Sequence, residues 1–229
     1  MPGGSLPVTE GDQVVPLIND LLDLPWDIVA FTQDYHPLFH VSFASTHHLE
    51  PYEPITLWYT EDAQLCNFTA DVFDYLVGDE ALEVCDVDGE AAHEVSQMLW
   101  PDHCIQNTTE GALHEDLAFN PGAHYLIRKG YENQIDAYSG FFDNGHFRMT
   151  ELPALFEEAG VTNVYVVGLA YDYCVSWTAK DARALGYKVA VIQDATRGID
   201  PETMQQATDD MTDLGIEIID SSDLLESIS

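Results

Sequence analysis

One cysteine stands at a position in the sequence where thiols are often chemically active. Cys174 comes shortly after the apolar run Val164–Leu169, which predicts a strand, and at the start of a predicted helix. A helix N-terminus lowers the pKa of a thiol and offers free backbone N–H groups to an anion. A thiolate nucleophile and an oxyanion hole are what acyl-transfer chemistry needs. The alternative from this feature alone is a cysteine that only packs in the helix.

Two further segments carry side chains of the kind that bind metals. Asp34 and His36 end another apolar run, and in extended structure their spacing of two points both side chains the same way. One carboxylate oxygen and one imidazole suit zinc, iron or manganese. The segment Trp100-Pro101-Asp102-His103 offers a stacking wall and a third ligand. Taken singly, each segment also fits an ordinary surface loop.

The elements that must position these residues follow from hydrophobic periodicity and helix-end signals. Strands alternate with helices, which predicts a parallel sheet with helices on both faces. We therefore expect an α/β fold with three layers and a mainly parallel sheet, in a single domain over residues 1–229. A surface insertion is expected at about 61–98, and residues 35–60 are expected to be loop. The predicted helices are 11–23, 150–160, 173–185 and one from 200, and the predicted strands are 27–34, 124–129, 164–169, 189–192 and 216–219.

Composition excludes several classes of partner. The net charge of −34 repels nucleic acid and anionic membrane surfaces. It fits a solvated surface suited to high salt or, alternatively, an acidic face for a basic partner. No apolar run approaches the ~20 residues of a membrane span, and the N-terminus does not resemble a signal peptide, so we expect a cytoplasmic protein. The four cysteines show no CxxC pair and do not suggest a disulfide framework.

Read together, the motifs resemble the nicotinamidases of the isochorismatase-like hydrolase superfamily. Five motifs occur in family order and span nearly the whole chain outside the expected insertion. They are Phe31–Pro37 with Val41–Ala44, Leu99–Cys104, Lys129–Gly130 with Ala137–Phe141, Gly168–Val175, and Asp194–Ile199.

The resemblance implies a role for each matching position. Cys174 would attack the carboxamide carbon of nicotinamide, and Lys129 would stabilise its thiolate. The backbone N–H groups of Ala170 and Cys174 would form the oxyanion hole, with a cis peptide bond between Leu169 and Ala170. The reaction would pass through a thioester and release ammonia and then nicotinate, as part of NAD salvage.

The resemblance also implies one divalent metal ion that holds the pyridine ring. Zinc is the first choice, with iron or manganese as alternatives. The sequence leaves open whether the chain forms a homo-oligomer. The implied metal ligands are Asp34, His36 and His103, with His40 as an extra or outer member, and the implied walls facing the ring are Trp100 and Tyr138.

One departure from the family pattern concerns general acid/base catalysis. The family opens with a strand of the type Asp-x-Gln-x-Asp-Phe, whereas this sequence begins at Met1-Pro2-Gly3-Gly4-Ser5, where that strand would already have ended. Asp12, Asp20 and Asp23 cannot replace the acid/base aspartate, because all three lie in or beside the first predicted helix. We expect a sequence that was started too late, rather than a genuine short form.

Two other functions compete with this prediction. One is a related amidase that acts on a ureido or carbamoyl substrate, although such relatives generally lack the Asp-x-His and Trp-Pro-x-His segments. The other is a non-catalytic short form that binds metal and nicotinamide, or a partner protein.

Overall fold

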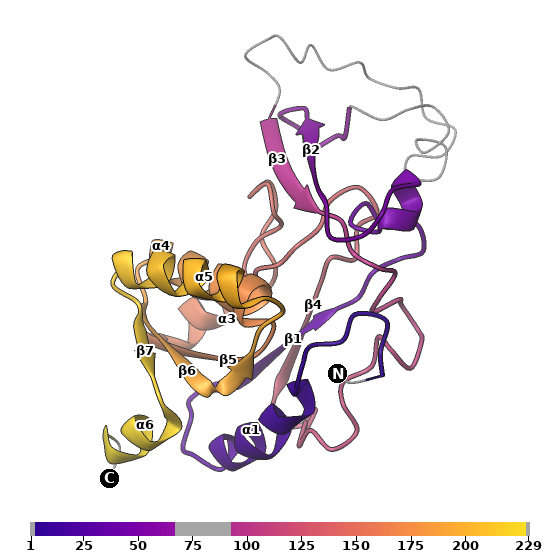
Figure 1. Cartoon of the computed structure of the whole chain (residues 1–229). Helices are drawn as coiled ribbons and strands as arrows, with labels where there is room; N and C mark the ends of the chain where they lie inside the picture. Colours follow the sequence, from indigo (N-terminus) through magenta and orange to yellow (C-terminus); the bar gives the residue numbers. More distant parts are fainter. Residues whose placement is uncertain (1–2, 67–92, 228–229) are drawn as a thin grey trace.

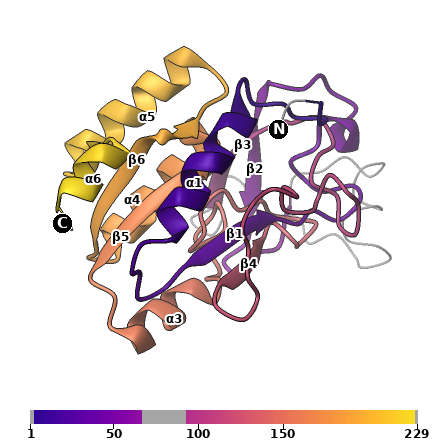
Figure 2. The same ribbon diagram turned by 90° about the horizontal axis from the view of Figure 1, so that it is seen from below.

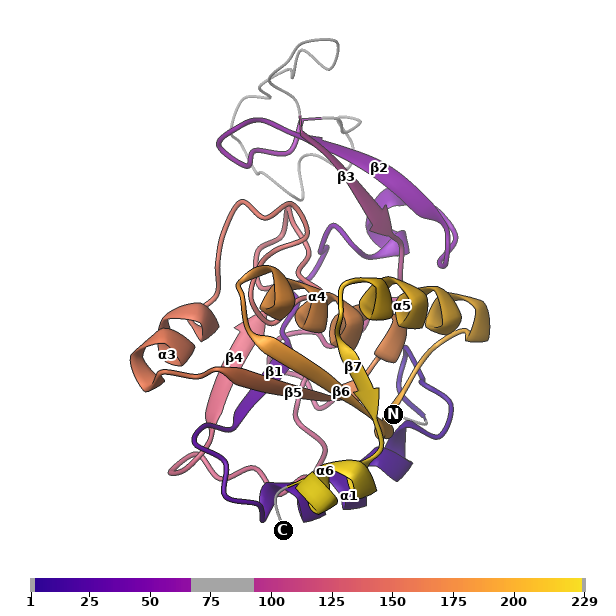
Figure 3. The same ribbon diagram turned by 90° about the vertical axis from the view of Figure 1, so that its left-hand side faces the viewer.

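The computed structural model describes residues 3–66 and 93–227, and its largest unit is a three-stranded parallel sheet (Figure 1). The strand order is β5-β6-β7, and all neighbours are parallel. Two helices cover one face of this sheet, and two others lie on the opposite face (Figure 3). The strands are β5 (Asn163–Leu169), β6 (Lys188–Arg197) and β7 (Glu217–Ile219), and the helices are α4 (Ser176–Ala184) and α5 (Pro201–Asp213) on one face and α1 (Val14–Leu22) and α6 (Ser221–Ser227) on the other.

A second parallel sheet has two strands, β1 (Ala30–Asp34) and β4 (Tyr125–Lys129). Their register places Ala30 opposite Tyr125 and Asp34 opposite Lys129. Helix α3 (Leu152–Ala159) follows in the chain and ends at Gly160, whose left-handed φ of 67° favours glycine. The α/β fold class with three layers is confirmed. Among the described residues, β1 and β5 do not pair with each other, so the parallel strands lie in two separate sheets.

An antiparallel hairpin of β2 (Pro54–Tyr59) and β3 (His93–Met98) lies outside both parallel sheets (Figure 1). Residues 54–59 are therefore a strand and not the loop that was expected. Most of the predicted insertion lies outside the described residues, so the insertion stays a prediction. Its last six residues form β3, whose Val95 and Gln97 are buried. Cys66, before the gap, is disulfide-bonded, which the cysteine pattern did not indicate.

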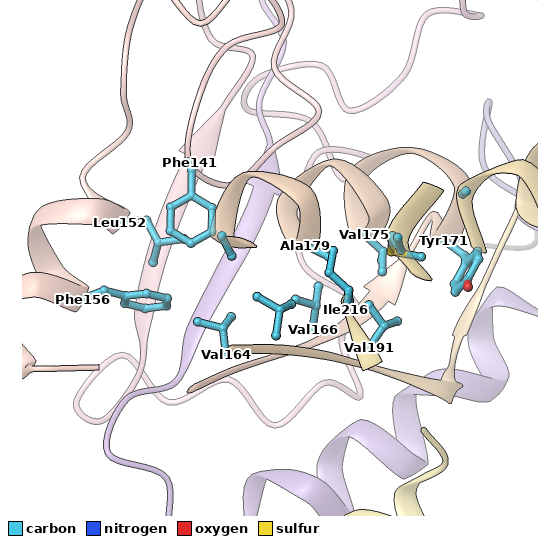
Figure 4. Packing of buried hydrophobic residues seen from close by; sticks show 14 of the residues in the cluster. Phe141, Leu152, Phe156, Val164, Val166, Tyr171, Val175, Ala179, Val191 and Ile216 are labelled. Carbon is cyan, nitrogen blue, oxygen red and sulfur yellow. The ribbon is translucent and has the colours of Figure 1, made fainter. Parts of the chain in front are cut away.

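The main core lies between the three-stranded sheet and helices α3, α4 and α5 (Figure 4). Val164 and Val166 of β5 meet the α4 residues from below, and Phe141 packs edge to face on Phe156 at 5.7 Å between ring centroids. Helix α5 begins as the sequence predicts, because the Asp200 carboxylate accepts bonds from the N–H groups of residues 202 and 203. Burial of these apolar side chains stabilises the three-stranded sheet. The candidate site lies at the carboxyl end of its strand β5.

The shorter elements complete the description. Two are 3-10 turns, η1 (Gly11–Gln13) before α1 and η2 (Ala44–His47) after β1, and a wide helical turn, η3 (Tyr171–Val175), joins β5 to α4. None of the helices in the described ranges is both long and apolar enough to cross a membrane.

Candidate active site

Cys174 lies in the turn η3, between the carboxyl end of β5 and the first residue of α4. The peptide bond between Leu169 and Ala170 is cis, as expected. The Ala170 carbonyl accepts from the N–H groups of Tyr173 and Val175, at 3.1 Å each. The two donors flank Cys174 in the chain, and the N–H of Cys174 does not donate to this carbonyl. The assignment of the Ala170 and Cys174 N–H groups to an oxyanion hole stays a prediction.

The position of the turn η3 is set by a buried carboxylate. Asp172 is 7% exposed and accepts from the backbone N–H groups of Ile199 and Asp200, at 3.1 Å each. It also accepts from the Thr203 hydroxyl at 2.6 Å. These bonds tie the turn that carries Cys174 to the loop between β6 and α5, so the thiol is held by two segments of the chain.

The side chain of Lys129 connects the β1-β4 sheet to the turn η3 that follows β5. It ends β4, and its side chain is 3% exposed. Its Nζ atom lies 2.5 Å from Asp34 Oδ1, 2.7 Å from the Ala137 carbonyl oxygen and 3.4 Å from Cys174 Sγ. All three hydrogens of the ammonium group therefore have an acceptor within reach.

The electrostatics of this cluster differ from the sequence-based expectation. Burial raises the pKa of Cys174 to about 11, and the nearby charge of Lys129 offsets only part of that rise. The predicted lowering by the helix N-terminus is thus outweighed, because the thiol is withdrawn from water. Burial alone would raise the pKa of Asp34. The charges of Lys129, His36 and His103 have the larger effect and lower this pKa to about 2. Burial opposes the charged form of Lys129 as well, yet Asp34 raises its pKa overall.

The three predicted metal ligands come together. One ligand atom each of Asp34, His36 and His103 lies within 4.8 Å of the others. The Nδ1 atoms of both histidines face backbone carbonyl oxygens, those of Gly130 at 2.7 Å and Pro101 at 2.8 Å. Such bonds fix the tautomer and leave Nε2 free as a ligand. One carboxylate and two imidazoles fit a zinc-type divalent ion with open positions.

His40 and Asp136 adjoin this cluster. The His40 ring stacks on the His36 ring at 4.1 Å between centroids, and ligand atoms of His36, His40 and Asp136 also lie within 4.8 Å of one another. His40 is fully buried, and within residues 3–66 and 93–227 its Nε2 has no hydrogen-bond partner. The role of His40 as an extra or outer member of the metal cluster stays a prediction. The sequence did not single out Asp136.

The two predicted wall residues meet in space. Trp100 Nε1 donates to the Tyr138 hydroxyl at 3.1 Å, and both side chains are buried. Tyr173 packs edge to face on Trp100, with centroids 4.7 Å apart, and lies 5.5 Å from Tyr138. Gln97 donates to the same hydroxyl at 3.0 Å. Sequence reasoning missed the last two residues, although Tyr173 directly precedes Cys174, and nothing in the sequence pointed to Gln97.

One cavity of about 1070 Å³ joins the thiol, the metal cluster and the aromatic wall. Residues lining it include Asp34, His36, Trp100, His103, Tyr138 and Cys174. The fold and this arrangement define a class, namely an α/β protein with a buried thiol–lysine pair beside a carboxylate–imidazole cluster, at the carboxyl ends of parallel strands.

Comparison with known proteins agrees with this class. The family model of the isochorismatase domain matches residues 66–223. A nicotinamidase from Acinetobacter baylyi is 35% identical over 226 residues, which covers 98% of this chain and 88% of the relative. The chain therefore belongs to the isochorismatase family.

Solved structures show the same fold. The yeast nicotinamidase Pnc1p bound to the inhibitor nicotinaldehyde superimposes with a TM-score of 0.78 at 28% identity, covering 96% of this chain and 93% of that one. A pyrazinamidase of Pyrococcus horikoshii in complex with zinc gives a TM-score of 0.65 at 29% identity, covering 96% and 92%.

Proposed function

We propose that this protein is a nicotinamidase, which hydrolyses nicotinamide to nicotinate and ammonia in NAD salvage. The observation that carries the proposal is the contact of Lys129 Nζ with Cys174 Sγ at 3.4 Å, beside the Asp34–His36–His103 cluster. A thiol paired with a lysine is suited to attack a carboxamide carbon. The nicotinamidase relative and the nicotinaldehyde-bound neighbour support nicotinamide as the substrate.

In the proposed reaction, Cys174 Sγ forms a bond to the carboxamide carbon. The N–H groups of Ala170 and Cys174 donate to the developing oxyanion. The C–N bond then breaks, and the proton that leaves the thiol goes to the departing nitrogen, which is released as ammonia. Water attacks the resulting thioester, returns a proton to Sγ and releases nicotinate. Lys129 would stabilise the negative charge on Sγ by donating to it, as the thiol loses its proton in the first step and as the sulfur leaves the thioester in the second.

The residues that would hold a metal ion are Asp34, His36 and His103, with His40 as an extra or outer member. When bound, a divalent ion would supply a Lewis-acidic contact for the ring nitrogen, and zinc suits this donor set, with iron or manganese as alternatives. Trp100 and Tyr138 form walls that orient the ring and keep water from its faces.

The test is release of ammonia from nicotinamide by the metal-loaded chain and by two cysteine variants. Cys174→Ala should lose more than ~10⁴-fold in rate, because it lacks the nucleophile. Cys104→Ser is the matched control, since it removes the other free thiol of the described residues and keeps the contact of Lys129 Nζ with Cys174 Sγ. A trapped Cys174 thioester, seen by mass spectrometry, would identify the intermediate. Ammonia release that survives in Cys174→Ala would contradict the proposal.

A further inference from the structure

The β2–β3 hairpin lies outside both parallel sheets, yet one of its buried polar side chains contacts the candidate site (Figure 1). Val95 and Gln97 of β3 are both buried, whereas Ser96 between them is exposed. Val95 packs in an apolar cluster with Leu57 and Tyr59 of β2. Gln97 is 1% exposed, although an apolar side chain would fill such a position without the cost of burying an amide. The hydrogen bonds of Gln97 must therefore offset that cost.

The amide of Gln97 has hydrogen-bond partners at both of its polar atoms. Its Nε2 atom lies 2.8 Å from the Met98 carbonyl oxygen, 3.0 Å from the Tyr138 hydroxyl oxygen and 3.2 Å from Asp136 Oδ2. Its Oε1 atom accepts from Asn144 Nδ2 at 3.2 Å. A carbonyl and a carboxylate can only accept, so they must face the nitrogen of the amide and not its oxygen. The orientation of the Gln97 side chain is therefore determined by its partners.

The same contacts hold Tyr138 at both ends. Its hydroxyl oxygen accepts from Gln97 at 3.0 Å and from Trp100 Nε1 at 3.1 Å. An indole N–H can only donate, so both lone pairs of this oxygen are engaged. The backbone N–H of Tyr138 donates to Asn144 Oδ1 at 2.8 Å, and Asn144 in turn donates to Gln97. Trp100 and Tyr138 line the cavity, and Gln97 lies behind them.

We propose that Gln97 is a positioning residue for substrate binding, which acts through the Tyr138 hydroxyl and fixes the aromatic wall against which the substrate ring lies. Side chains that are held in place before binding lose less freedom when the ligand arrives, and this raises affinity. The inference rests on the proposed function, because Trp100 and Tyr138 are the walls that the nicotinamide ring would meet. It also gives the hairpin a role, since β3 brings Gln97 to the wall from outside the two parallel sheets.

The first experiment measures binding of nicotinamide to the zinc-loaded Cys174→Ala chain by isothermal titration calorimetry, so that turnover does not interfere. Adding Gln97→Met should weaken binding by about 10-fold, the equivalent of one hydrogen bond. Ser96→Ala is the matched control on the same strand, because its side chain is exposed, and it should leave the affinity unchanged. A role in stability alone would lower the melting temperature of the Gln97→Met chain and leave its affinity unchanged. That result would overturn the inference.

A double-mutant cycle tests whether Gln97 acts through the hydroxyl. Tyr138→Phe removes the oxygen and keeps the ring, so it should weaken nicotinamide binding about as much as Gln97→Met does. The two changes together should weaken binding no further, because both remove the same contact. A further loss of about 10-fold in the double variant would show that Gln97 acts through another group, such as Asp136, and would overturn the inference. Unchanged affinity in Tyr138→Phe would overturn it as well, even if Gln97→Met did not fold.

Turnover by the chain that retains Cys174 supplies a second readout. The wall would meet the ring equally in the ground state and in the transition state, so Gln97→Met should raise KM for nicotinamide about 10-fold and change kcat by less than ~3-fold. A fall in kcat with an unchanged KM would overturn the inference. Binding by the Cys174→Ala chain tests the proposed function, whereas only the ratio between variants tests Gln97. Failure of one is therefore distinguishable from failure of the other.

Discussion

The two parallel sheets of the molecule contribute to the candidate site in opposite ways. The β5-β6-β7 sheet is packed by helices on both faces and places Cys174 at its edge, since η3 directly follows β5. Seen from below, helices α1 and α6 lie over the near face of this sheet (Figure 2). The β1-β4 pair places Asp34 beside Lys129, 95 residues away, through strand register. One half of the site is therefore local in sequence, and the other depends on tertiary pairing.

The forces that hold the two halves also differ. Around β6 the interior is apolar, with Val191 and Ala195 fully buried. Around the ends of β1 and β4 the interior is polar, with Lys129, His36 and Asp136 all nearly inaccessible to water. A buried charge is costly without its partner, whereas lost apolar contacts are tolerated in proportion to area. Single substitutions should therefore damage the second half more than the first.

The largest effect is expected at Lys129. Lys129→Met leaves Asp34 charged and without its ammonium partner, so we expect a loss of about 3 kcal/mol in the free energy of unfolding, together with loss of activity. Urea denaturation measures the first and ammonia release the second. Lys180→Met is the matched control in the other half, because Lys180 meets Asp210 only at 4.0 Å near the surface. The control should cost less than ~1 kcal/mol. Equal losses would contradict the contrast between the halves.

Substitution of a predicted metal ligand tests whether the polar half of the site binds metal as well as stabilising the fold. His36→Ala should weaken zinc binding by more than ~100-fold, since even groups outside a ligand set change affinity by ~10–100-fold. Metal content after dialysis against zinc and then buffer measures this directly. His114→Ala is the control, because His114 lies in a loop beside Asp116 and outside the cluster. Unchanged zinc content in His36→Ala would refute the ligand assignment.

A polar interaction in the other half should matter less. Asp172→Ala leaves the N–H groups of Ile199 and Asp200 without their acceptor, which should cost ~1–3 kcal/mol. It should also loosen η3 and lower the rate of ammonia release. Asp209→Ala, on the exposed face of α5, is expected within ~0.5 kcal/mol of wild type. Chemical denaturation of both variants settles the comparison, and a neutral Asp172→Ala would show that apolar packing alone holds the turn.

The smallest effect is expected in the β2–β3 hairpin, at high pH. Burial raises the pKa of Tyr59 well above its ordinary value, helped by the charges of Asp136 and Asp143. The folded chain thus keeps this proton while the unfolded chain loses it, so stability should fall as pH rises above ~10. Tyr59→Phe loses the bond to the Gln134 carbonyl, about 1 kcal/mol at neutral pH, but its decline above pH 10 should be shallower. Parallel slopes in denaturation across pH 8–11 would contradict this.

Much of the fold could be predicted from sequence where signals are local. The apolar run at 164–169, the cap at Asp200 and the glycine stop at Gly160 each mark an element that the structure contains. The burial of each element could not be predicted in this way. β1 belongs to an apolar run of the sequence, yet it is only partly covered. Whether a strand is central or at an edge depends on its neighbours, and periodicity does not report neighbours.

The sequence by itself determined the residue types of the site and the order of its motifs. The spacing of Asp34 and His36, and the place of Cys174 after a strand, are local properties that chain order preserves. Only the tertiary structure decided that Lys129 reaches both Asp34 and Cys174, and that burial raises the thiol pKa. Strand register and exclusion of water act between segments far apart in the chain, so no local pattern encodes them.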